Sequence, residues 1–247
     1  MQRYFINTEI KDKVEILGTD FHHIKNVMRM KTGDKVYISN NENSYLAKID
    51  AILNDRVLLS IIEKIDYESE MPYKVTIAQG LVRREKKEEV IRRITELGAY
   101  RYIPIIMDRS IVKYNGDDKL ERGRLIIKEA SEQSHRNHLM ELYNTITLYD
   151  LIKNKDEFDL CLFAYEDSGR SSNFKLKEYL KEIKESEKEN ILVIIGPEGG
   201  FSDKEVTTLL NNGFKAVGLG PRILRTETAP LYVMSAISYE LELKEEE

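Results

Sequence analysis

The chain has 247 residues, of which 41% are hydrophobic and 33% are charged, and its formal net charge is −5. This composition excludes a disordered or collagen-like chain, and the length allows one large domain or two smaller ones. The single cysteine, Cys161, excludes a disulfide framework and a cysteine-based zinc site, which favours a reducing, cytoplasmic location. The first residues lack the apolar segment of a secretion signal, and the longest apolar run, residues 191–195, is far too short to span a membrane.

The acidity is concentrated at the carboxyl end. Residues 240–247 hold five acids and one lysine, so they account for −4 of the net charge of −5. Residues 83–93 instead hold six bases and three acids. Such a segment can contact phosphates although the whole chain is acidic, and a solvated helix face with i,i+4 ion pairs explains it equally well.

Residues 1–66 predict a small antiparallel β-barrel or sandwich with one helix. Polar and apolar residues alternate at 35–39, and further strands are expected at 45–53 and 57–65 with turns between them. Thr19 or Asp20 is expected to cap a helix that runs to about Met30. The polar stretch 66–72 then separates an amino-terminal domain, residues 1–70, from a second domain, residues 73–247.

From Tyr73 onward, predicted strands alternate with predicted helices. This alternation indicates an α/β domain with a largely parallel sheet and helices on both faces. We expect strands at 75–81, 102–107, 142–147, 160–165, 191–195 and 216–219, and helices at 86–97, 119–137, 174–185, 203–212 and 229–243. Ligands bind beyond the carboxyl ends of the strands in such sheets, so the loops at that edge are the place to look for a site.

Two loops that contain glycines follow short strands near the carboxyl end. The first, Gly196-Pro197-Glu198-Gly199-Gly200-Phe201-Ser202, leads into a helix through a predicted capping box of Ser202 and Glu205. Its spacing matches neither a phosphate-binding Walker loop nor the dinucleotide fingerprint, and alone it fits an ordinary tight turn. The second loop holds Arg225 and Glu227 among threonines, with Thr228 expected to cap the last helix. Together the two loops favour a site for a flat, adenosine-like ligand.

Both loops resemble the signature of the SPOUT methyltransferases, and more narrowly that of the ribosomal RNA small subunit methyltransferase E family, which methylates uracil N3 in 16S ribosomal RNA. The resemblance extends along nearly the whole chain, including Arg3-Tyr4-Phe5, His23-Ile24, Gly33-Asp34, Arg84-Glu85-Lys86-Lys87 and Glu129-Ala130-Ser131-Glu132-Gln133-Ser134. The sequence departs from the family's pattern at Asn41, His135 and Pro230, outside the two glycine loops.

The resemblance implies a PUA-like β-barrel that binds RNA, followed by an α/β domain with a trefoil knot at its carboxyl end. It also implies S-adenosylmethionine (SAM) as cofactor, a homodimer, and 16S ribosomal RNA or the small ribosomal subunit as substrate. Periodicity alone would predict an unknotted sheet, since connections rarely thread loops. The implied cofactor-binding residues lie in the two loops and at the ends of neighbouring strands: Tyr165, Ile195, Gly196, Glu198, Gly199, Leu219, Gly220, Leu224, Arg225, Thr226, Thr228 and Ala229.

Methylation of uracil N3 requires loss of the N3 proton and alignment of the nitrogen with the methyl donor. Arg225 is the expected cation that stabilises negative charge on the ring, and Glu198 and Glu227 compete as base or cofactor contact. The candidate RNA contacts are Arg3, Arg29, Arg84, Lys86, Arg109 and Arg136. Glu132, His135 and His138 share a spacing that could face a metal, but no further ligand accompanies them, so we expect no metal.

Two other functions stay open at this point. One is a SPOUT enzyme that modifies another RNA base or a ribose 2′-hydroxyl. The other is a ribosome-assembly factor that binds RNA without catalysis, against which Arg225 and the two intact glycine loops argue.

Overall fold

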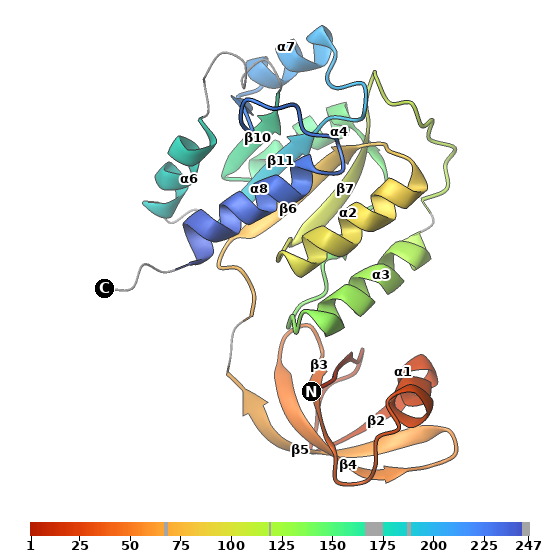
Figure 1. Cartoon of the computed structure of the whole chain (residues 1–247). Coiled ribbons are helices and arrows are strands. Elements are labelled where there is room, and N and C mark those ends of the chain that lie inside the picture. Colours follow the sequence, from red (N-terminus) through yellow and green to blue (C-terminus); the bar gives the residue numbers. More distant parts are fainter. Residues whose placement is uncertain (67–68, 119, 166–174, 187–188, 244–247) are drawn as a thin grey trace. The chain divides into compact units, whose positions relative to one another are not determined.

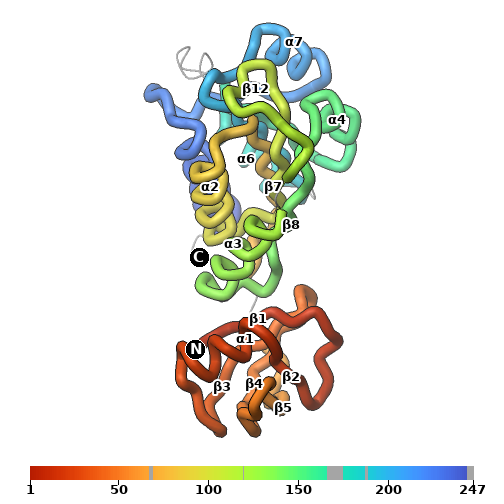
Figure 2. Tube along the Cα trace, turned by 90° about the vertical axis from the view of Figure 1, so that its right-hand side faces the viewer, coloured from red at the N-terminus to blue at the C-terminus, as the bar shows by residue number. Residues whose placement is uncertain are grey.

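The computed structural model describes residues 1–66, 69–118, 120–165, 175–186 and 189–243. The chain divides into two compact units (Figure 2). The barrel unit comprises Met1–Glu70 and Lys128–Leu139, and the sheet unit comprises Met71–Ile127 and Met140–Glu247. The division falls inside helix α3 (Leu120–Gln133), so residues 128–139, which the sequence groups with the second domain, are part of the barrel unit.

The barrel unit is built on a five-stranded sheet in the order β1-β3-β4-β5-β2. Its strands are β1 (Arg3–Phe5), β2 (Lys13–Leu17), β3 (Lys35–Ser39), β4 (Ser44–Ile52) and β5 (Arg56–Ile65). Alternate residues of these strands, such as Val36 and Ile38, are buried around Tyr4 and Ile24, as a period of two requires. The pairing is antiparallel as predicted except between β1 and β3, which run parallel.

The helix of the barrel unit differs from the prediction. Helix α1 (Gly18–His22) continues only as a π-helical turn, η1 (His23–Val27), and Arg29 then takes a left-handed backbone with φ of 51°. The predicted capping residues lie inside α1, since Leu17 occupies the N-cap position. Asp20 does not cap the helix because its carboxylate accepts a hydrogen bond from Lys128 Nζ at 2.5 Å.

The described residues of the sheet unit form a seven-stranded sheet, in which all strands pair in parallel (Figure 1). They are β6 (Lys74–Gly80), β7 (Arg101–Ile106), β8 (Glu141–Leu142), β9 (Ile146–Thr147), β10 (Leu160–Ala164), β11 (Asn190–Ile195) and β12 (Lys215–Val217). The order is β12-β10-β11-β6-β7-β8, and β9 also pairs with β7. The predicted α/β class is therefore confirmed.

Helices cover both faces of this sheet. They are α2 (Arg84–Glu96), α4 (Leu148–Lys153), α6 (Leu176–Lys184), α7 (Asp203–Asn211) and α8 (Ala229–Ile237), with short turns η2 (Lys155–Glu157) and η3 (Ser238–Glu242). Helices α2 and α8 lie side by side on one face (Figure 1). On the other face, Leu151 of α4 and Leu209 of α7 pack in one cluster with Phe163 and Ile194 of the central strands. Burial on both faces explains why residues 191–195 are uniformly apolar.

Two predicted elements of the sheet unit differ clearly in their bounds, and one helix was not predicted. The strand expected at 142–147 is two short strands, β8 and β9, because the backbone N–H and hydroxyl of Thr145 bind Asp118 and draw the chain between them away from the sheet. Helix α4 was not predicted, although Thr147 caps it by accepting from Asp150 N. The last helix ends as α8 at Ile237 and continues to residue 242 only as the π-helical turn η3. Residues 119 and 174, at the predicted starts of two helices, lie outside the described residues.

Candidate active site

A cavity of about 740 Å³ opens at the carboxyl edge of the sheet, between the two glycine loops. Tyr165 follows β10 directly, residues 196–201 follow β11, and residues 219–227 follow β12, and all of them line it. This volume falls within the range of roughly 300–1,000 Å³ that is usual for small-molecule sites. The location agrees with the rule that ligands of open α/β sheets bind beyond the strand ends.

The cavity gathers nearly all residues predicted to bind the cofactor. Those that line it are Tyr165, Ile195, Gly196, Glu198, Gly199, Leu219, Gly220, Leu224, Arg225, Thr226 and Ala229. Thr228 does not line it, and although Thr228 occupies the N-cap position of α8, its side chain makes no capping hydrogen bond. The binding roles of the others stay predictions.

The first glycine loop is held at both ends. The predicted capping box is confirmed: Ser202 Oγ accepts from Glu205 N at 3.2 Å, and Glu205 Oε2 accepts from Ser202 N at 2.7 Å. Glu205 Oε1 also accepts from Asp108 N at 2.8 Å. A Cβ on Gly199 would lie 2.7 Å from the backbone oxygen of Arg109, so only glycine allows this approach. The loop is therefore fastened to the segment that carries Arg109.

Thr226 of the second glycine loop lies on the cavity wall and also binds the first loop. Thr226 is 8% exposed and its hydroxyl donates to the carbonyl oxygen of Gly196 at 2.7 Å. Its neighbours Arg225 and Glu227 line the cavity. Each loop thus contributes to the other's position, which the sequence did not predict because the two segments are separated by α7 and β12.

Lys86, in the first turn of α2, bridges the two loops through their glutamates. Its Nζ lies 3.3 Å from Glu198 Oε1 and 3.1 Å from Glu227 Oε2. The hydrogen bond with Glu227 raises the pKa of Lys86 despite its partial desolvation, and Glu198 adds to the rise. Desolvation alone would raise the pKa of Glu227, but its own backbone N–H and Lys86 outweigh it and hold that pKa below the usual range. Lys86 and Glu227 are therefore both charged at neutral pH.

Arg225 differs from Lys86 and Arg109, two other basic residues of the cavity. Its charge helps to lower the pKa of Glu227, yet its exposed guanidinium forms no ion pair with any residue in the described part of the chain. Arg109 Nη2 lies 3.9 Å from Asp203 Oδ1, and the Lys86 ammonium forms ion pairs with two glutamates. Arg225 is therefore available to an incoming negative group, as is Arg222, which also lines the cavity and forms no ion pair within the described residues.

The predicted RNA contacts fall into two groups. Lys86 and Arg109 line the cavity, and Arg29 and Arg84 are exposed, Arg84 in an i,i+4 ion pair. By contrast, Arg3 and Arg136 are each 3% exposed.

The two buried arginines serve the interior of the barrel unit. Arg3 donates to Ser44 Oγ at 2.8 Å and to Asn137 Oδ1 at 2.5 Å, and Arg136 donates to Glu70 Oε2 at 2.5 Å. Burial lowers the pKa of Arg3. A basic residue in the sequence does not reveal whether its charge is used internally, and the RNA contacts of Arg3 and Arg136 stay predictions.

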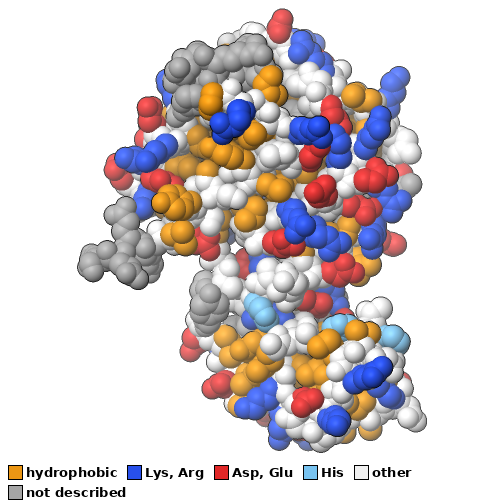
Figure 3. All heavy atoms as spheres, in the orientation of Figure 1, with side chains coloured by type: hydrophobic (Ala, Val, Ile, Leu, Met, Phe, Trp, Pro, Cys, Tyr) orange, Lys and Arg blue, Asp and Glu red, His pale blue; other side chains and the backbone are white. Residues whose placement is uncertain are grey.

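Other features of the described residues carry no comparable site. The predicted helical spacing of Glu132, His135 and His138 is broken, because α3 ends at Gln133 and His135 has a φ of 59°. Within the described ranges no three potential metal ligands gather, and no helix there has the length and apolarity to cross a membrane. Basic and acidic side chains are interspersed over the face of the sheet unit drawn in Figure 3.

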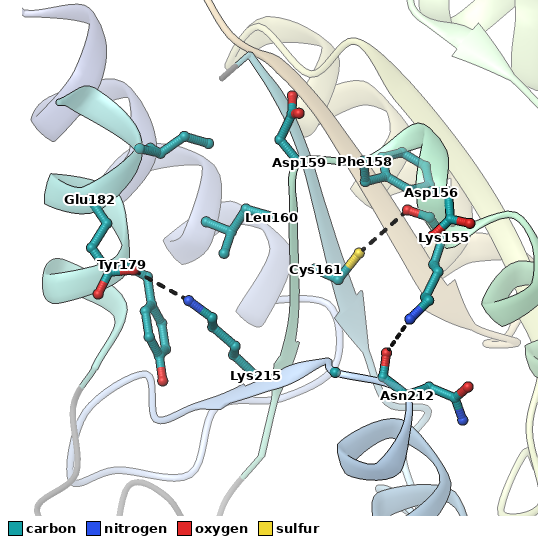
Figure 4. A pocket seen from close by; sticks show the side chains of 12 residues that line it. Lys155, Asp156, Phe158, Asp159, Leu160, Cys161, Tyr179, Glu182, Asn212 and Lys215 are labelled. Carbon is teal, nitrogen blue, oxygen red and sulfur yellow. Dashed lines mark hydrogen bonds and ion pairs between the residues drawn. The ribbon is translucent and has the colours of Figure 1, made fainter. Parts of the chain in front are cut away.

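A second cavity of about 290 Å³ lies at the amino end of β10 (Figure 4). Its cations are engaged: Lys155 Nζ donates to Asn212 O at 2.8 Å, and Lys215 pairs with Glu182 at 3.3 Å. Burial raises the pKa of the Cys161 thiol to about 11, so this thiol is protonated at neutral pH. The cavity offers no activated group, which leaves the site between the glycine loops as the candidate for chemistry.

The chain is similar to known RNA methyltransferases over nearly its whole length. An RNA methyltransferase domain family matches residues 69–238, and an RNA methyltransferase PUA domain family matches residues 16–62. Ribosomal RNA small subunit methyltransferase E of Bacillus subtilis is 40% identical over 98% of both chains, and that of a Synechocystis species is 31% identical over 94% of this chain and 75% of the relative. The solved structure of a Legionella pneumophila methyltransferase in complex with SAM is 27% identical, with a TM-score of 0.82 over 96% of both chains.

Proposed function

The chain belongs to the ribosomal RNA small subunit methyltransferase E family, and we propose that it transfers the methyl group of SAM to N3 of a uridine in 16S ribosomal RNA. The observation that carries this proposal is the pair of glycine loops around one cavity, with Arg225 on its wall and free of ion pairs in the described part of the chain. The Bacillus relative, named for small-subunit ribosomal RNA, supports the choice of substrate.

The residues that line the cavity fit SAM. A Cβ on Gly196 would lie 3.1 Å from the Phe201 ring, so glycine at this position allows the loop to pack closely on that ring. Backbone groups of Leu219, Gly220 and Leu224 are proposed to hold the adenine. SAM supplies an electrophilic methyl group on a positively charged sulfur. The negative charges of the two glutamates of the cavity would stabilise this positive charge.

The two glutamates and Arg225 are assigned different roles in methyl transfer. Glu198 and Glu227 face the Lys86 ammonium, and this cation helps to hold the pKa of Glu227 below its usual range, which makes Glu227 a weaker base than an isolated carboxylate. Arg225 has no such partner, and a cation beside O2 or O4 of uracil favours the ring that has lost its N3 proton. We therefore assign the main chemical role to Arg225 and place the glutamates in cofactor contact.

Arg225→Ala tests this assignment. The substrate is small ribosomal subunits prepared from a strain without the enzyme. Loss of the cation is expected to lower the rate of their methylation by about 10²-fold or more. SAM affinity, measured by titration calorimetry, should change by only a few fold, because backbone groups hold the adenine. Lys181→Ala on the exposed surface of α6 removes an equal charge outside the cavity and serves as the control. Turnover of the Arg225 variant at the wild-type rate would overturn the assignment.

Mass-spectrometric mapping of the methylated nucleotide separates the remaining functions. A methyl group on another base or on a ribose 2′-hydroxyl would favour a different SPOUT reaction. Absence of SAM binding by the wild-type protein would favour a ribosome-assembly factor that binds RNA without catalysis.

We further propose a homodimer and a trefoil knot around the second glycine loop, as the family resemblance implies. An apolar stripe along α8 and η3 supports the dimer: Tyr232, Tyr239 and Leu243 are 45%, 73% and 57% exposed at helical spacing. A second copy that covered this stripe would remove its apolar surface from water. We also propose that the barrel unit binds ribosomal RNA and that the protein acts in the cytoplasm, on ribosomal subunits.

A further inference from the structure

A buried chain of side-chain hydrogen bonds runs from the middle of the sheet to the wall of the cavity. Tyr102 on β7 donates its hydroxyl to Gln79 Oε1 at 2.9 Å. Gln79, on β6, donates from Nε2 to the carbonyl oxygen of Thr226 at 2.7 Å and to Thr226 Oγ1 at 3.1 Å. Thr226 Oγ1 in turn donates to the carbonyl oxygen of Gly196 at 2.7 Å.

The direction of every hydrogen bond in this chain is determined. A carbonyl oxygen only accepts, so the nitrogen of the Gln79 amide must face Thr226 and its oxygen must face Tyr102. The Tyr102 hydroxyl must then donate, and burial raises its pKa, which keeps the proton in place. Since Thr226 Oγ1 accepts from Gln79, its own hydrogen is available to Gly196. Bonds aligned in this way reinforce one another.

A glutamine is an unexpected residue at this position of the sheet. Gln79 is fully buried, and Val75, Ile77 and Ala78 of the same strand are apolar. Apolar side chains of similar shape fill such positions at no cost in desolvation, so stability alone does not call for an amide here. The polar chain ends at Gly196 and Thr226, two residues on the cavity wall.

We propose that Gln79 is a positioning residue for methyl transfer. Through Thr226 it fixes the backbone between Arg225 and Glu227, and through the Thr226 hydroxyl it holds Gly196 of the first loop. Gln79 thereby sets the distance between the two glycine loops and the direction of Arg225, although it does not line the cavity itself. This inference rests on the function proposed above.

Two substitutions of Gln79 separate positioning from packing. Gln79→Met keeps the length of the side chain and removes all of its hydrogen bonds. We expect kcat/KM to fall about 10²-fold, as for a displacement of roughly 1 Å in a catalytic group. Gln79→Glu keeps the shape and can donate to Thr226 only while its carboxyl is protonated, a form that burial favours. Its activity relative to wild type should therefore be highest at low pH and fall as pH rises.

Thr95→Val is the matched control. Thr95 on α2 is as buried as Gln79, and its hydroxyl donates to Ile91 O at 2.7 Å, away from the cavity. This variant loses one buried hydroxyl and is expected to keep its kcat/KM within about threefold of wild type. Urea denaturation of all variants reports the accompanying loss of stability.

The outcomes distinguish this inference from the function on which it rests. If the wild-type protein neither binds SAM nor methylates small subunits, the proposed function fails and the inference with it. If the wild type is active and both Gln79 variants match it, only the inference is overturned. It is likewise overturned if Thr95→Val loses as much activity as Gln79→Met, or if the Gln79→Glu profile follows that of wild type at every pH.

Discussion

Gly80 ends strand β6 directly behind the first glycine loop, and Gly80→Ala tests how closely the two are packed. The added Cβ would lie 2.5 Å from Pro197 Cδ, 2.6 Å from Pro197 N and 3.0 Å from Met107 Sδ. Non-bonded carbon atoms pack at about 3.5–4.0 Å, so the loop must move by roughly 1 Å to admit the methyl group. Neither the proline ring nor the backbone nitrogen can turn aside as a flexible side chain would.

The size of the effect follows from this displacement. Overpacking of a tightly packed interior costs about 1–3 kcal/mol, which we expect as the loss in free energy of unfolding. The displaced loop lines the cavity, and a misplacement of about 1 Å lowers the rate by about 10²-fold. Gly80→Ala should therefore lose far more activity than its loss of stability explains at temperatures where the variant is folded.

Urea denaturation and methylation of small subunits measure these two quantities. Gly116→Ala is the control: Gly116 has a φ of +85° with nothing within 4 Å of the added Cβ, so the substitution strains the backbone without a clash. A left-handed alanine costs about 1–2 kcal/mol, a similar loss of stability, but it should leave turnover near wild type. Wild-type activity in Gly80→Ala, or an equal loss in both variants, would refute the reasoning.

Two further substitutions test the structure outside the chemistry. Ser202→Ala removes the cap of α7 and the hydrogen bond from Ser202 to Asp108 at 2.6 Å, and should lower the free energy of unfolding by about 1 kcal/mol in urea denaturation. In the barrel unit, burial raises the pKa of Glu132 to about 7 from 4.5, with Lys128 opposing the rise and Asp20 adding to it. The folded protein then prefers the neutral carboxyl, so this contribution to stability is complete below pH 4.5 and lost as pH rises through 7. Glu132→Gln should remove that decline, and stability curves for variant and wild type that run parallel from pH 5 to 8 would contradict it.

The sequence predicted those elements whose signals are local. An uninterrupted apolar run identified β11, and Ser202 with Glu205 identified the start of α7, because capping depends on residues three positions apart. Predictions failed where a residue far away in the sequence binds a side chain that was expected to act locally. Asp20 binds Lys128 and does not cap α1, and Asp118 binds Thr145 and interrupts a strand.

The same distinction applies to the candidate site. The sequence identified both glycine loops, since their residues are contiguous, and nearly all of the predicted cofactor residues line one cavity. It did not identify Gln79, Gly80 or the bridging contacts of Lys86, which lie more than 100 positions before the loops they touch. No periodicity or spacing within one segment encodes such contacts, because the parallel sheet creates them by bringing β6 beside β11.

The two connections between the loops differ in physical character, and this difference assigns them different roles. The contacts of Lys86 with Glu198 and Glu227 join partly exposed charges, which water and salt screen, so they contribute little to holding the loops in place. The chain from Gln79 through Thr226 to Gly196 is buried and is not screened. The geometry of the cavity therefore depends on the buried connection, whereas Lys86 affects the charge of the cavity, because its ammonium group offsets one of the two carboxylates.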